Sequence, residues 1–125
     1  MDRELIYKNE TYRIIGLCME VHRELGHGFL EIVYKDALEL LFRQNDIPYE
    51  REKEYKIKFR NVILPHKFFA DFVVFDKIIL EVKAGAGIVD DNIAQTLNYL
   101  KVSENKLALL VNFGRMQLEY KRLIF

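Results

Sequence analysis

Apolar residues have helical spacing over the first third of the chain. Between residues 11 and 25 they stand three or four positions apart, which predicts one helix. Gly26-His27-Gly28 interrupts this pattern, so we expect the helix to end there. Helical spacing resumes near Phe29 and stops before Ile47-Pro48, because proline disfavours helix in the residue that precedes it. This part of the chain is therefore predicted to be two helices joined by a glycine turn.

The middle of the chain alternates between apolar and polar residues, or is apolar throughout. Alternation at residues 55–59 predicts a half-exposed strand, and residues 61–65 predict a turn or a short strand pair. Two runs rich in β-branched and aromatic residues follow, at residues 68–75 and 78–84. Only Asp76-Lys77 separates these runs, which favours an antiparallel hairpin.

The last third of the chain has the pattern of one more helix and two strands. Glycines at positions 85 and 87 predict a loop, after which Asp90 or Asp91 can cap a helix through Val102. Residues 106–112 and 116–125 are predicted strands around Gly114. The order of elements predicts an α/β (α+β) fold in which a mixed sheet packs against helices.

Composition limits the classes of function. The 125 residues are half apolar, which is enough for the core of one domain. Nineteen basic and nineteen acidic residues leave no net charge, so a polybasic nucleic-acid or membrane binder is not supported. No apolar run approaches the length of a membrane span, and the first residues lack a signal-like segment. We therefore expect a soluble cytoplasmic protein that has no contact with membranes.

One cysteine, Cys18, lies within the apolar pattern of the first predicted helix. It cannot form an internal disulfide, and no paired cysteine or histidine spacing suggests a zinc site. We expect Cys18 to fill the core.

Three charged residues interrupt strands that otherwise have the character of core. Asp71 stands in one of the two apolar runs, and Glu81 and Lys83 stand in the next. An unpaired ion taken out of water costs several kcal/mol, so such positions need a reason. The two-residue period of a strand puts Glu81 and Lys83 on one face. With a turn near Asp76, Asp71 and Glu81 are equally distant from it, which predicts that they face each other on neighbouring strands.

This cluster has two interpretations. Two carboxylates provide oxygen ligands for a hard cation such as Mg2+, with a lysine beside them to act on an attacking water, and a phosphodiester is the natural substrate. Alternatively, Lys83 forms a partly buried salt bridge with Asp71 or Glu81 and no chemistry follows. The Glu-x-Lys spacing occurs four times in the chain and does not discriminate. Only the copy at Glu81 lies in a strand without other charges, after an apolar strand that bears an aspartate.

A third carboxylate lies on the second predicted helix. Glu31 stands at the edge of the apolar face formed by Leu30, Tyr34, Leu38 and Leu41, from which it could point over the sheet. A glutamate at such an edge is also an ordinary solvated residue, and in the first turn its charge favours the helix dipole. Both interpretations of Glu31 remain open.

Gly28, Glu31 and Tyr34, followed by Ala37-Leu38, match the signature of the GxxExxY protein family. The sequence resembles this family over roughly residues 11 to 123. Further matching segments follow in order: Val21-His22, Leu25-Gly26, Ala70-Asp71, Glu81-Val82-Lys83-Ala84, Ala94-Gln95, Leu97-Asn98-Tyr99-Leu100 and Asn112-Phe113-Gly114. The family is placed in the PD-(D/E)xK nuclease superfamily. The resemblance implies a restriction-endonuclease-like core, with a mixed central sheet flanked by helices, in a single domain over residues 1–125.

The resemblance also implies a site. Asp71 and Glu81 would bind Mg2+ or Mn2+, Lys83 would assist the water, and Glu31 would match a helix glutamate that completes the metal shell. We expect the main-chain carbonyl of Val82 to be a further ligand. The proline that precedes the aspartate in the superfamily is replaced here by alanine, which removes no ligand.

Two further assignments from the resemblance concern helix residues. Gln95 and Tyr99 resemble the Gln-x-x-x-Tyr element of the RecB-type exonuclease subgroup, and His22 could match its upstream histidine. Gln95 and Tyr99 share a helical stripe almost opposite an apolar stripe, so we expect them to approach the site only from its rim. A helix histidine that is hydrogen-bonded near the core is the alternative for His22.

The resulting hypothesis is a Mg2+-dependent nuclease that hydrolyses phosphodiester bonds of nucleic acid, with DNA expected ahead of RNA. One alternative is a catalytically inactive domain that binds nucleic acid or a partner. Another is a homodimeric interaction module that keeps the fold, in which the apolar final residues 123–125 contribute to self-association. Loss of metal-dependent cleavage in variants of Asp71 or Glu81 separates the first hypothesis from the other two.

Overall fold

The structure is a computed structural model that describes residues 6–125. The first five residues, on which the expected absence of an export signal rests, lie outside the described residues. The helices are α1 (Lys8–Leu25), α2 (Glu31–Gln44) and α3 (Asp90–Ser103). The strands are β1 (Tyr49–Phe59), β2 (Val62–Val74), β3 (Ile78–Lys83), β4 (Leu107–Asn112) and β5 (Glu119–Ile124).

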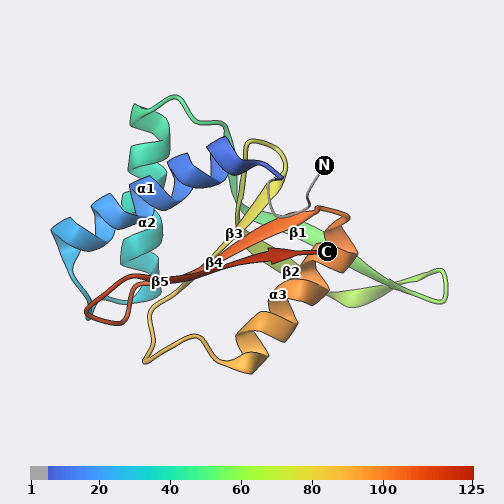
Figure 1. Cartoon of the computed structure of the whole chain (residues 1–125). Coiled ribbons are helices and arrows are strands. Elements are labelled where there is room, and N and C mark those ends of the chain that lie inside the picture. The colour runs from blue at the N-terminus through green and yellow to red at the C-terminus, as the bar shows by residue number, and fades with distance from the viewer. Residues whose placement is uncertain (1–5) are drawn as a thin grey trace.

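The five strands form one mixed sheet in the order β1-β2-β3-β4-β5 (Figure 1). Strands β3 and β4 are parallel and are connected through α3, whereas the other neighbouring strands are antiparallel. The predicted order of elements and the mixed sheet are therefore confirmed.

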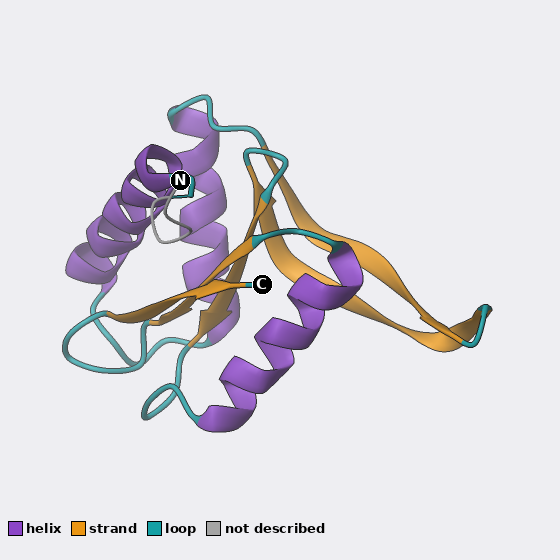
Figure 2. Cartoon of the chain, turned by 45° about the vertical axis from the view of Figure 1, so that its right-hand side comes forward, coloured by secondary structure: helices purple, strands orange, loops and turns teal. Residues whose placement is uncertain are grey.

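Helices cover both faces of the sheet (Figure 2). The larger core lies between the sheet and helices α1 and α2, and it contains the fully buried Cys18, as expected. A smaller core lies between the sheet and α3, where Leu100 packs near Ile79 and Ala108. No helix within residues 6–125 is both long enough and apolar enough to cross a membrane.

Two helix ends differ from the predicted positions. Helix α2 begins at Glu31, two residues after the predicted start, because Leu30 has an extended backbone. Helix α3 begins at Asp90, but neither Asp90 nor Asp91 caps it. Instead, the main-chain N–H of Val89 donates to Oδ1 of Asn92 over 3.0 Å. The two aspartates lie in the first turn, where their charge favours the helix dipole.

The β1–β2 hairpin is longer than predicted and projects from the body of the protein (Figure 2). Its turn is formed by Arg60 and Asn61, both with positive φ, as a two-residue turn of type I′ requires. Residues 62–65, predicted to belong to a turn or a short strand pair, are strand paired with β1 at Val62 and Ile63, and this strand is longer than predicted because β2 continues through Pro65. Proline is tolerated there because β3 pairs with β2 only from Phe72 onward.

The end of the chain contributes to the cores. Leu123 packs against the smaller core and Ile124 against the larger one, and both are partly buried. Phe125 remains exposed. Two of the three residues expected to contribute to self-association are therefore used within the chain.

Candidate functional site

Strands β2 and β3 separate beside Asp71 and Glu81. Their pairing runs from Val74 opposite Ile78 to Phe72 opposite Leu80, so Asp71 and Glu81 come next and face each other, as predicted. Beyond this point β2 continues with β1, and β3 continues with β4. We call this point, marked by Asp71, Glu81 and Val82, the fork.

The two carboxylates bridge the fork by hydrogen bonds to the opposite backbone. The main-chain N–H of Asp71 donates to Oε2 of Glu81 over 2.8 Å, and the N–H of Val82 donates to Oδ2 of Asp71 over 2.8 Å. The N–H and C=O of a strand residue point toward the same neighbouring strand, so the Val82 carbonyl also lies at this edge of β3. Three oxygen-bearing groups are therefore gathered at the fork.

Glu81 is the most shielded acid of the site, with 4% of its surface exposed. Burial and the nearby charge of Asp71 raise the pKa of Glu81 to about 8, although the positive charges of Lys83 and Lys35 oppose this shift. The high pKa means that the positive charge near the fork is too small to keep both carboxylates ionised at neutral pH. A bound cation would lower the free energy of the ionised pair.

Sequence reasoning missed two residues of the cluster, Lys35 and Glu52. The ammonium of Lys35 on α2 donates to Oδ1 of Asp71 over 3.0 Å and also to Glu52 of β1. Burial lowers the pKa of Lys35, but the hydrogen bonds to Glu52 and Asp71 outweigh that effect and raise it. The alternative interpretation predicted an ion pair of Lys83 with Asp71 or Glu81. The lysine that pairs with Asp71 is Lys35.

A weak signal exists in the sequence for Lys35 but not for Glu52. Lys35 directly follows Tyr34 and stands three positions before Leu38, at the border of the apolar face of α2. Glu52 has a positive φ and follows Arg51, which contacts Asp36 of α2. Such a backbone irregularity within a strand has no local sequence signal, and it becomes visible only in the structure.

Lys83 and Tyr99 lie on the α3 side of the fork. Lys83 follows Glu81 by two residues and shares its face of β3, and its charge acts on the pKa of Glu81. The ring of Tyr99 stacks on Phe68 with centroids 4.1 Å apart. Burial raises the pKa of the Tyr99 hydroxyl, and the negative charges of Glu81 and Asp71 raise it further. Gln95, one turn earlier on α3, is exposed.

Glu31 is exposed at the first position of α2, one turn before Lys35. Within residues 6–125 its side chain has neither a hydrogen bond nor an ion pair. The helix residue that contacts Asp71 is thus Lys35. The expectation that Glu31 belongs to a metal shell therefore stays a prediction.

His22 contacts the loop after β4. Its Nε2 lies 2.8 Å from the carbonyl oxygen of Arg115, and its ring centroid lies 6.1 Å from that of Phe113. This contact matches the interpretation of His22 as a helix histidine that is hydrogen-bonded near the core.

Tyr34 of the Gly-x-x-Glu-x-x-Tyr signature is a core residue. Its hydroxyl donates to the carbonyl of Gly26 over 2.7 Å and accepts from the N–H of Phe29, so it closes the loop between α1 and α2. Gly28 in that loop has a φ of 109°, which side-chain-bearing residues rarely adopt. The Tyr34 ring stacks on Phe113, with centroids 4.6 Å apart. The signature therefore places the start of α2 against the end of β4.

Asn112 fixes the loop that follows Lys83. The buried side chain of Asn112 accepts from the N–H of Gly85 and donates to the carbonyl of Gly85 and to Oε1 of Glu119. Oε1 of Glu119 also accepts from the N–H of Ile88. These bonds hold the C-terminal end of β3, and thereby Lys83, against β4.

Two hollows in the surface lie away from the fork. The larger, of about 910 Å³, is lined by His27 and residues 114–119. The other, of about 420 Å³, lies between α1 and β5. Neither contains Asp71 or Glu81. The two carboxylates lie instead where the pairing of β2 and β3 ends.

The residues of the fork fit a divalent cation. Mg2+ is commonly bound by one or two carboxylates and keeps several of its waters, and the fork offers two carboxylates and a carbonyl. The raised pKa of Glu81 is the sign of an acid pair that an added positive charge would stabilise. In the described chain no group of three or more His, Cys, Asp or Glu side chains is gathered as a metal site. The fit therefore rests on Asp71, Glu81 and the carbonyl of Val82.

Comparisons with known proteins agree with this geometry. Residues 8–123 match the model of a family described as the PD-(D/E)XK nuclease superfamily, whose members generally use divalent metals. The mixed sheet with three helices is consistent with the restriction-endonuclease-like fold. The superfamily is supported, whereas the narrower GxxExxY assignment stays a prediction.

The chain is also similar to the crystal structure of SSO0001, with 18% sequence identity and a TM-score of 0.59. The match covers 74% of this chain and 49% of the other, so the chain spans about half the length of that protein. At this identity the likeness concerns the fold alone. No curated protein matches.

Proposed function

The chain belongs to the PD-(D/E)XK nuclease superfamily, and from this premise we propose that it hydrolyses phosphodiester bonds of DNA, or of RNA, with Mg2+ or Mn2+ at the fork. Membership of this superfamily implies a nucleic-acid substrate. One observation carries the proposal: Asp71 and Glu81 face each other where β2 and β3 separate, with Lys83 on the same face of β3 as Glu81.

Each residue of the fork has a role in this proposal. Asp71, Glu81 and the carbonyl of Val82 hold the cation. When bound, the ion supplies Lewis acidity toward a phosphate oxygen and lowers the pKa of a bound water. Lys83 orients the attacking water and stabilises the negative charge that develops in the transition state. Lys35 is a positioning residue, because its contact with Asp71 sets the orientation of that carboxylate.

Glu31 and Gln95 are outlying members of the proposed site. Glu31 lies one turn before Lys35 on α2, and Gln95 lies one turn before Tyr99 on α3. Both side chains are exposed. Their replacement is expected to slow cleavage, whereas replacement of Asp71 or Glu81 abolishes it.

The test compares the parent protein with Asp71→Asn, Glu81→Gln and the control Glu104→Gln, which alters an exposed glutamate. Calorimetric titration with Mg2+ and Mn2+ is followed by incubation with labelled DNA and RNA. We expect the parent and the control to bind the ion and cut, and the two fork variants to do neither. Cleavage that survives in either fork variant, with its fold verified by circular dichroism, would contradict the proposal.

A second candidate function follows from the contacts of Asp71. Both of its carboxylate oxygens are engaged, one by Lys35 and the other by the N–H of Val82. A fork held closed by these bonds would suit a catalytically inactive domain that binds nucleic acid or a second copy of the chain. This candidate predicts binding without cleavage and indifference to Mg2+, so the same titration distinguishes it.

A further inference from the structure

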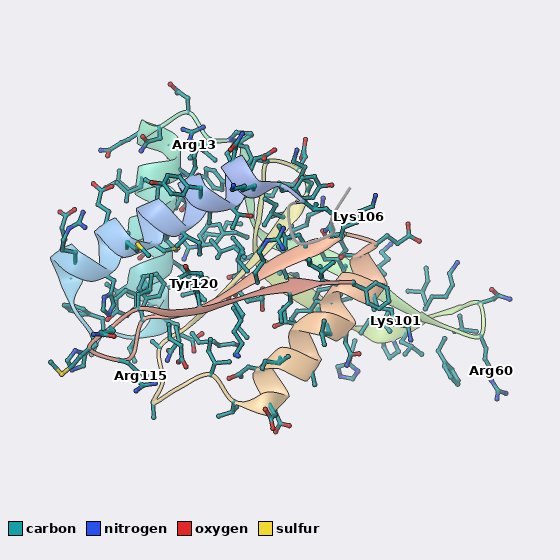
Figure 3. The ribbon with its side chains drawn as sticks, in the orientation of Figure 1. Arg13, Arg60, Lys101, Lys106, Arg115 and Tyr120 are labelled. Atoms are coloured by element: carbon teal, nitrogen blue, oxygen red, sulfur yellow. The ribbon has the colours of Figure 1, made fainter. Side chains whose placement is uncertain are left out.

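We propose that the distal β1–β2 hairpin, residues 53–69, is a binding arm for double-stranded DNA that guides the duplex to the fork. We call these residues the arm. The inference rests on the proposed function and adds to it a surface and a substrate class. Figure 3 shows the arm projecting beyond the helices, with Arg60 at its end.

The arm holds a local excess of positive charge in a neutral chain. It contains five basic residues and one acidic residue, so its net charge is +4 and the rest of the chain carries −4. The five basic residues are Lys53, Lys56, Lys58, Arg60 and Lys67. Positive charge concentrated on a protruding element is the electrostatic signature of a surface that binds phosphates.

The placement of Lys56 and Lys58 disfavours a purely structural role, whereas Lys53 is paired with Glu50 and Lys67 with Glu54. Lys56 and Lys67 are direct cross-strand partners, so two like charges share one face of the ribbon. Such pairs destabilise a hairpin unless an anion lies close to them, and here Glu54 lies 3.4 Å from Lys67 whereas Lys56 has no acidic partner among the described residues. Lys58, two residues further along the same face, is also exposed. Within residues 6–125 neither Lys56 nor Lys58 forms an ion pair.

The base of the arm is held rigidly. The Tyr55 ring stacks on Phe68 with centroids 5.0 Å apart, and Phe68 stacks in turn on Tyr99 of α3. Asn105 donates to the hydroxyl of Tyr55. One face of the arm is therefore fixed to α3. The opposite face carries Lys56, Lys67 and Glu54.

The lysine face continues into the fork. The alternate exposed positions of β1 place Lys56 and Lys58 on one face, with the acids Glu52 and Glu54 between them and the fork. The carboxylate of Glu52 shares Lys35 with Asp71. The face that carries Lys56 and Lys58 thus leads to Lys35, the cation beside Asp71, so a duplex held by these lysines would lie next to the fork.

The dimensions and the tip of the arm fit a duplex. A two-stranded ribbon enters the major groove of B-DNA, which is about 12 Å wide, whereas the major groove of A-form RNA is too deep and narrow. From Lys53 to Phe59 the ribbon extends about 20 Å at the usual rise per residue. At the tip, Phe59, Val62 and Ile63 are 58%, 61% and 53% exposed. These apolar side chains provide a surface for base edges once the flanking cations contact phosphates.

The test measures binding of a short labelled DNA duplex by fluorescence anisotropy at several salt concentrations in EDTA. The arm variant carries Lys56→Ser, Lys58→Ser and Lys67→Ser. The control variant carries Lys8→Ser, Arg23→Ser and Lys106→Ser, which removes the same charge from exposed positions outside the arm. We expect the arm variant to lose at least about tenfold in affinity and about 2.7 units of the log–log salt slope, at about 0.9 per phosphate contact. The control should stay within about twofold of the parent.

Several outcomes would overturn the inference. These are unaltered DNA binding by the arm variant, an equal loss in the control, or equally tight binding of duplex RNA. Binding of the parent to anionic vesicles that disappears in the arm variant, with DNA binding unaffected, would assign the arm to a membrane surface. If the triple variant does not fold, Lys58→Ser alone is expected to reduce the slope by about 0.9.

The test also separates this inference from the proposed function. Binding is measured without metal, and calorimetric titration of Mg2+ into the arm variant should match the parent. DNA binding that depends on the arm, in a protein that never cuts, would contradict the proposed function alone. Cleavage that depends on Asp71, with DNA binding that is independent of the arm, would contradict the arm alone.

Discussion

Lys35 Nζ lies 3.0 Å from Oδ1 of Asp71 and ties helix α2 to the fork. The lysine side chain is only 11% exposed, so solvent and salt screen this pair weakly. Asp71 uses its other oxygen to accept from the N–H of Val82. Lys35 is therefore the positive charge with which any cation at the fork competes for Asp71.

Replacement of Lys35 by methionine should destabilise the protein in a metal-dependent way. In EDTA we expect Lys35→Met to lose about 2 to 3 kcal/mol of unfolding free energy, below the range for fully buried pairs because Glu52 is half exposed. Saturating Mg2+ should reduce this loss, because the ion replaces the missing charge beside Asp71. Urea denaturation with and without Mg2+ measures both values.

The exposed pair of Lys67 and Glu54 provides the control Lys67→Met, with an expected loss of unfolding free energy under about 1 kcal/mol. A loss for Lys35→Met that Mg2+ leaves unchanged would contradict this prediction.

The raised pKa of Glu81 predicts a pH dependence of stability. Between its ordinary value of 4.5 and about 8, the folded protein holds a proton on Glu81 that the unfolded chain has released. The unfolding free energy contributed by Glu81 therefore falls as pH rises through this window, by a few kcal/mol at most.

Replacement of Glu81 by glutamine should remove this decrease of the unfolding free energy with rising pH. In EDTA we expect the variant to be less sensitive than the parent to a change from about pH 5 to about pH 9, and more stable than the parent at the higher value. Chemical denaturation at both pH values is the measurement, with Glu24→Gln as the exposed control. If the parent and Glu81→Gln lose stability equally between these pH values, Glu81 is not the group responsible.

Gly114 allows the loop after β3 to approach the loop after β4. A Cβ at this position would lie 2.2 Å from the carbonyl oxygen of Gly85 and 2.7 Å from the carbonyl carbon of Ala84. We expect Gly114→Ala to cost about 2 to 3 kcal/mol, because backbone atoms must move, and to slow any cleavage that depends on Lys83. Gly87→Ala is the matched control, since its Cβ would meet only Glu119 at 3.9 Å. Thermal denaturation of both variants decides the prediction, and equal melting temperatures would refute it.

Cys18 should be chemically inert in the folded protein. It is fully buried, and burial raises the pKa of its thiol to about 12, so the reactive thiolate is absent at neutral pH. We expect no reaction with a thiol reagent under native conditions and complete reaction in denaturant. A spectrophotometric thiol assay measures both. Rapid labelling of the native protein would show that α1 opens readily.

The order of elements was accessible from the sequence because periodicity is a local property. The spacing of apolar residues in α1 and α2 and the turn between β2 and β3 each follow from short stretches of chain. The same locality explains the errors. The cap of α3 and the continuation of β2 through Pro65 depend on neighbouring side chains and on strand pairing, which periodicity does not report.

At the fork, the sequence alone determined that Asp71 and Glu81 face each other and that Lys83 shares the face of Glu81. Strand period and equal distance from one turn are enough for that conclusion. Only the tertiary structure decided that Lys35, and not Lys83, pairs with Asp71, and that Glu52 joins them. These contacts join residues that are 36 and 17 positions apart. They depend on how α2 packs over the sheet and on the positive φ of Glu52. Neither feature is visible in the spacing of apolar and polar residues along the chain.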